Sequence, residues 1–90
     1  MKNKALFLDR DGVINIDSGY VHKKENFIFL EEIFEVVSYA NKNGYLVIVI
    51  TNQAGIARGL YTEDEFHLIS EWMKKEFNKK NCNIDDIFFS

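Results

Sequence analysis

The chain has 90 residues, 47% of them apolar and 28% charged, which is typical of one globular domain and too short for two. Its 11 basic and 14 acidic side chains give a net charge of −3, which disfavours nucleic-acid and anionic-membrane partners. A single cysteine, Cys82, excludes an intrachain disulfide framework and is typical of a reducing compartment. The apolar runs are too short for a membrane span or a signal peptide, so we expect a cytoplasmic protein.

Three apolar runs predict β-strands. They cover residues 5–8, residues 45–50 and, more weakly, residues 87–89. Unbroken apolar runs of this length are typical of strands in a parallel sheet that are buried on both faces.

Two segments between these runs have helical spacing. Residues 31–43 place apolar side chains on one stripe and end before Gly44, but no good N-cap residue precedes them. A capping box, Thr62-Glu63-Asp64-Glu65, predicts the start of a second helix, whose lysines we interpret as a solvated face. The order predicts an α/β fold, a Rossmann-like parallel sheet with helices on both faces, of which this chain contains the first three strands.

Polar residues follow the first two predicted strands. Asp9-Arg10-Asp11-Gly12 comes after the first, and Thr51-Asn52-Gln53-Ala54-Gly55 comes after the second. In an open α/β sheet, ligands bind at the carboxyl ends of the strands. The connection from Asn15 to Leu30 is also longer than usual, and such loops are usually functional.

Two facing carboxylates repel an anionic substrate, and a divalent cation relieves that repulsion. Mg²⁺ typically uses one or two protein carboxylates together with substrate phosphate oxygens. The pair Asp9 and Asp11 therefore predicts a metal-assisted phosphate site, in which one aspartate attacks phosphorus and the other transfers protons. The alternative is a charged surface turn with an internal ion pair.

Several other polar residues have two interpretations. Asp85-Asp86 precedes the third strand at the opposite edge of the sheet, so we interpret it as a solvated turn. His22 either lines the site or caps the long loop, whereas His67 is expected to be structural and Cys82 a free thiol. Arg10 and Arg58 either meet phosphate or form surface ion pairs.

The motifs resemble those of the haloacid dehalogenase superfamily of phosphotransferases. Residues 7–15 are similar to its first motif and residues 50–59 to its second. Residues 17–22 and 62–73 resemble the branch of heptose 1,7-bisphosphate 7-phosphatases, to which histidinol-phosphate phosphatases are related. The resemblance extends over nearly the whole chain from Ala5 onward.

The resemblance implies a role for each motif residue. Asp9 is the nucleophile that forms an aspartyl-phosphate, and Asp11 is the general acid and base. Mg²⁺ is held by the Asp9 carboxylate and the Asp11 main-chain carbonyl. Thr51 and Asn52 bind the transferring phosphoryl group. The other residues expected to bind the phosphorylated sugar are Arg10, Asp17, Ser18, Gly19, Tyr20, Gln53 and Ala54.

The resemblance also implies that residues 1–90 are the N-terminal part of one longer phosphatase domain, monomeric when complete. The family continues with a lysine and an acidic residue that belong to the second half. A zinc-binding loop of this branch begins with a cysteine after the third strand, where this chain has Ser90, so no zinc ligand is assigned. We expect the 90-residue chain alone to be aggregation-prone and nearly inactive, with the first strand as an exposed edge.

The expected function is Mg²⁺-dependent removal of a phosphate from heptose 1,7-bisphosphate through an aspartyl-phosphate. The alternatives are a histidinol-phosphate phosphatase and a catalytically incomplete fragment. A receiver-type signalling module is disfavoured, because its acceptor aspartate would stand where this chain has Ser90.

Overall fold

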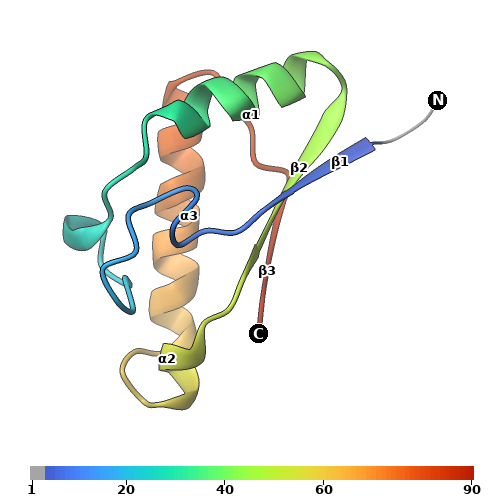
Figure 1. The fold of residues 1–90 in the computed structure, drawn as a ribbon. Coiled ribbons are helices and arrows are strands. Elements are labelled where there is room, and N and C mark those ends of the chain that lie inside the picture. The colour runs from blue at the N-terminus through green and yellow to red at the C-terminus, as the bar shows by residue number, and fades with distance from the viewer. Residues whose placement is uncertain (1–3) are drawn as a thin grey trace.

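The computed structural model describes residues 4–90, which form a three-stranded parallel sheet. The strands are β1 (Lys4–Leu8), β2 (Tyr45–Thr51) and β3 (Asp86–Phe89), in the order β1-β2-β3 (Figure 1). Leu8 pairs with Val49, and Thr51 pairs with Phe89. The predicted α/β fold with a Rossmann-like parallel sheet is confirmed, and β1 lies at the edge of these three strands.

Two long helices connect the strands. Helix α1 (Glu32–Lys42) has no side-chain N-cap, as expected, and Gly44 beyond its end has a φ of +78°. Helix α3 (Glu63–Lys79) begins with the predicted capping box, in which the Thr62 hydroxyl accepts from the Glu65 backbone N–H at 3.1 Å. A short helix, α2 (Ala54–Ala57), follows β2 and was not predicted. The remaining helical turn is the 3-10 helix η1 (Lys24–Asn26).

Both long helices cover the same face of the sheet (Figure 1). Val47 and Val49 of β2 are fully buried in a core that includes Val37 of α1 and Phe77 of α3. The predicted coverage of both faces is therefore wrong for residues 4–90. Successive crossovers of the same hand that step in the same direction across a sheet place their helices on one side.

The opposite face of the sheet is open within the described residues. It carries exposed apolar side chains from all three strands. The prediction that the three strands are buried on both faces is also wrong for this part of the chain. The exposed residues are Phe7, Leu46, Ile50 and Phe88.

The residues interpreted as structural take part in local packing and hydrogen bonds. Asp85 accepts a hydrogen bond from the Val47 backbone N–H at 2.7 Å, and Asp86 begins β3. His67 contacts the ring of Phe89 edge-on at 5.5 Å. Cys82 is a free, buried thiol, as expected. No helix in residues 4–90 is long and apolar enough to cross a membrane.

Candidate active site

The predicted site residues Asp9 and Thr51 lie at the carboxyl ends of two neighbouring strands. Asp9 directly follows β1 and is exposed, whereas Thr51 is the last residue of β2 and only 4% exposed. Because β1 and β2 are parallel and paired up to Leu8 and Val49, Asp9 and Thr51 lie at the same edge of the sheet. This is the edge at which open α/β sheets bind ligands.

A cavity of about 310 Å³ opens beside this edge. The strand ends contribute Asp11, Asn52 and Gln53 to its lining, and the Asn15–Leu30 loop contributes Asp17 and Tyr20. Gly19, Ala54 and Tyr61 complete the lining. Of the lining residues, only Tyr61 was not predicted from the sequence. Four predicted site residues are not part of the lining, namely Asp9, Arg10, Ser18 and Thr51.

One oxygen of the Asp11 carboxylate is held by two side chains. Oδ1 accepts from Arg10 Nη2 at 2.9 Å and from Asn15 Nδ2 at 3.0 Å. Its other oxygen, Oδ2, takes part in neither contact. Asp11 is therefore fixed in orientation by one oxygen while the residue itself lines the cavity.

Arg10 lies beneath the loop and not in the cavity. Its side chain is 2% exposed, and Nη2 also donates to the Val21 carbonyl at 2.6 Å. The guanidinium stands 5.5 Å from the centre of the Phe27 ring. The prediction that Arg10 contacts the substrate does not fit this position, because its bonded donors hold Asp11 and the loop. The ion pair of the alternative interpretation is formed, but its Arg10 guanidinium is buried and not on the surface.

The loop that carries Asp17 to Tyr20 is shaped by local hydrogen bonds. Gly19 has a φ of +87°, and its N–H donates to Asp17 Oδ1 at 3.2 Å. His22 Nδ1 lies 2.8 Å from the Tyr20 carbonyl oxygen, and the His22 ring stacks on Tyr61 at 4.8 Å. Of the two roles considered for His22, the structure favours capping of the loop. Arg58 places its guanidinium 5.8 Å from the centre of the Tyr20 ring.

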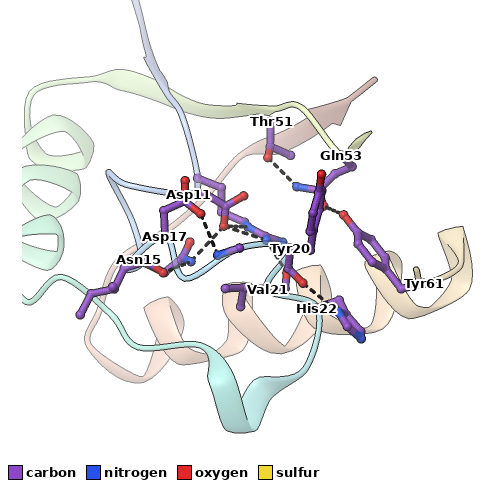
Figure 2. A network of polar contacts seen from close by, with 12 residues as sticks. Asp11, Asn15, Asp17, Tyr20, Val21, His22, Thr51, Gln53 and Tyr61 are labelled. Carbon is purple, nitrogen blue, oxygen red and sulfur yellow. Dashed lines mark hydrogen bonds and ion pairs between the residues drawn. The ribbon is translucent and has the colours of Figure 1, made fainter. Parts of the chain in front are cut away.

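A second network joins Thr51, Gln53 and Tyr61 (Figure 2). Gln53 Nε2 donates to the Thr51 hydroxyl at 2.7 Å, and the Tyr61 hydroxyl donates to Gln53 Oε1. Burial raises the pKa of Tyr61 above its ordinary value. Tyr61 occupies the position before the Thr62 N-cap, which often carries an apolar side chain that packs on the helix. That signal indicates burial of Tyr61, but not its place in the cavity wall.

Hard divalent cations take oxygen ligands, and the described residues offer two carboxylates here. Asp9 and Asp11 lie on either side of Arg10, directly after β1. In residues 4–90 no three histidine, cysteine, aspartate or glutamate side chains gather into a metal site. Two carboxylates nonetheless fit Mg²⁺, which usually keeps several waters and also binds substrate phosphate.

No family model matches the chain. It is 57% identical over 89 residues to a D-glycero-alpha-D-manno-heptose-1,7-bisphosphate 7-phosphatase from Burkholderia mallei, covering 99% of this chain and 47% of that protein. A D-glycero-beta-D-manno-heptose-1,7-bisphosphate 7-phosphatase from Haemophilus influenzae is 44% identical, with coverages of 97% and 47%. The chain resembles about half of a heptose bisphosphate phosphatase.

A solved structure agrees with this resemblance. The D,D-heptose 1,7-bisphosphate phosphatase from B. bronchiseptica, complexed with magnesium and phosphate, superposes with a TM-score of 0.90 at 31% identity. The match covers 97% of this chain and 49% of that one. The predicted resemblance is confirmed, and the chain spans about half the length of the curated relatives it matches.

Proposed function

We propose that this chain carries the nucleophile of a Mg²⁺-dependent phosphatase that hydrolyses heptose 1,7-bisphosphate. One observation carries the proposal. The chain matches phosphatases of that name over almost all its length, and the matched segment contains Asp9, Asp11, Thr51 and Asn52 at adjacent strand ends. The names of these relatives favour a sugar bisphosphate over histidinol phosphate as the substrate.

Each of these residues has a defined part in the proposed reaction. The Asp9 carboxylate attacks phosphorus and forms an aspartyl-phosphate, while the bond between phosphorus and the sugar oxygen breaks. Asp11 donates a proton to the departing sugar oxygen and then takes one from the water that hydrolyses the intermediate. Thr51 and Asn52 donate hydrogen bonds to the phosphoryl oxygens, on which the charge is spread.

The loop and the short helix α2 supply the remaining contacts to the sugar in this proposal. Asp17 and Tyr20 line the cavity from one side, and Asn52 and Ala54 line it from the other. Asp9 and the Asp11 main-chain carbonyl would hold Mg²⁺, which neutralises charge on the phosphoryl group when bound. The magnesium and phosphate in the B. bronchiseptica structure support Mg²⁺ as the metal in this proposal.

The domain to which this chain belongs and its cellular location are proposed on the same grounds. The relatives are about twice as long as this chain, which supports residues 1–90 being one part of a single larger phosphatase domain. The free thiol of Cys82 is consistent with a reducing cytoplasm.

The test uses the unmodified chain and a chimera in which this chain replaces the matching half of the Burkholderia mallei phosphatase. Phosphate release is measured with both anomers of heptose 1,7-bisphosphate and with histidinol phosphate. We expect the chimera to prefer a heptose bisphosphate by at least about 100-fold in kcat/KM. The control is Asp9→Asn, which removes the attacking carboxylate oxygen. Full activity of Asp9→Asn, or a preference for histidinol phosphate, would contradict the proposal.

A further inference from the structure

The polar groups of Tyr61, Gln53 and Thr51 form one continuous line from the start of α3 to the end of β2 (Figure 2). The three side chains belong to residues that are 5%, 3% and 4% exposed, respectively. A buried polar group without a partner is costly, so each member depends on its neighbour for a hydrogen bond.

The line has a direction. The Tyr61 hydroxyl donates to Gln53 Oε1. The Gln53 amide must then present its nitrogen to Thr51, whose oxygen accepts at 2.7 Å. A hydroxyl that already accepts from Gln53 retains its own proton for another acceptor.

Packing keeps the Tyr61 ring in this position. One face stacks on His22, with 4.8 Å between ring centroids and 7° between planes. Gly55 of α2 lies so close that a Cβ atom there would collide with the Tyr61 ring. The donor at the start of the line is therefore held by both the loop and α2.

We infer that Gln53 and Tyr61 are positioning residues that orient the Thr51 hydroxyl as a hydrogen-bond donor to a phosphoryl oxygen. The inference rests on the proposed function, because it requires Thr51 to bind the transferring group. It differs from the role implied by the family resemblance, in which Gln53 contacts the sugar. With the Gln53 amide reversed, Thr51 would donate to Oε1 and would have no proton for the phosphoryl group.

A double-mutant cycle in the chimera separates positioning from direct contact. Thr51→Val removes the hydroxyl, and Gln53→Met removes the amide at similar volume. We expect Thr51→Val to lower kcat about 100-fold and Gln53→Met about tenfold, with KM changed less than about threefold. In the Thr51→Val background, Gln53→Met should change kcat less than about twofold, because the two residues act through one hydrogen bond.

Two further variants test the direction of the line. Tyr61→Phe removes only the hydroxyl and should lower kcat about threefold to tenfold, whereas Tyr39→Phe on exposed α1 surface should change nothing. Gln53→Glu replaces the donor with a second acceptor and should lower kcat more than Gln53→Met does. Circular dichroism and urea unfolding of each variant confirm that the fold is retained.

The outcomes distinguish this inference from the proposed function. If the chimera with the unmodified chain releases no phosphate, the proposed function fails first. If it is active and the losses from Gln53→Met and Thr51→Val multiply, Gln53 acts independently of Thr51 and the inference is wrong. A tenfold rise in KM at constant kcat in Gln53→Met would likewise indicate direct substrate contact.

Discussion

Gly55 tests whether the Tyr61 ring is as tightly held as the structure indicates. The residue is buried in α2, and a Cβ atom there would overlap the ring at Tyr61 Cε1. It would also approach Tyr61 Cζ and Tyr20 Cδ1 to 3.0 Å each. Gly55→Ala therefore forces both rings to move.

The expected cost follows from two opposing effects. Overpacking of this kind destabilises a protein by about 1–3 kcal/mol, and the overlap with a ring stacked on His22 favours the upper value. Replacing glycine by alanine inside a helix stabilises the folded state by up to about 1 kcal/mol. We expect Gly55→Ala to lower the free energy of unfolding by about 2 kcal/mol, measured by urea unfolding of the chimera.

The matched control removes the Tyr61 ring with which the new Cβ atom would collide. In a Tyr61→Ala background, Gly55→Ala has lost its main clash and should cost less than about 0.5 kcal/mol. The single variant should also lower kcat, because a displaced Tyr61 no longer donates to Gln53. A Gly55→Ala protein as stable as the unmodified one would show that the ring is free to move, and the positioning argument would lose its basis.

Four other perturbations probe separate features. Arg10→Met leaves Asp11 without its guanidinium partner and should cost about 2 kcal/mol in urea unfolding as well as lowering kcat, whereas an unchanged kcat would exclude orientation of Asp11 by Arg10. Thr62→Ala removes the capping box of α3 and should lower the free energy of unfolding by about 1 kcal/mol in the same assay. Thr62→Ser keeps a hydroxyl and should retain most of that stability. Burial raises the pKa of Cys82, so the thiol loses its proton more readily in the unfolded chain than in the folded one. The free energy of unfolding should therefore fall as the pH rises above the ordinary thiol pKa of 9.0, and Cys82→Ala should reduce this pH dependence. Removal of divalent cations with EDTA should abolish phosphate release and added Mg²⁺ should restore it, while activity that persists in EDTA would refute the metal assignment.

The features predicted correctly from the sequence depend on short stretches of chain. The capping box needs only Thr62 and Glu65, which meet because a helix has formed between them. The placement of Asp9 and Thr51 at one edge needs only two adjacent parallel strands. Local pattern and strand direction therefore sufficed to predict the gathering of Asp11, Asn52 and Gln53 around one cavity.

The features that were missed depend on contacts between distant segments. Arg10 is buried because the loop returns over it and offers the Val21 carbonyl, eleven residues further along the chain. An arginine between two aspartates has no local feature that distinguishes this position from a substrate contact. The covered face of the sheet is likewise set by the order of the strands in space, which apolar runs do not encode.

The cavity carries more negative than positive charge within residues 4–90, which supports the proposed Mg²⁺. Asp11 and Asp17 line it, and its lining within residues 4–90 contains no lysine or arginine. The nearest cation to Asp11, Arg10, donates to that carboxylate and to a backbone carbonyl beneath it. At an effective dielectric constant of about 20, two like charges 4 Å apart repel by about 4 kcal/mol, enough to weaken phosphate binding about a thousandfold. In the proposed reaction Thr51 and Asn52 would orient the phosphoryl group through hydrogen bonds that carry no positive charge. Positioning and charge neutralisation are therefore assigned to different parts of the proposed site.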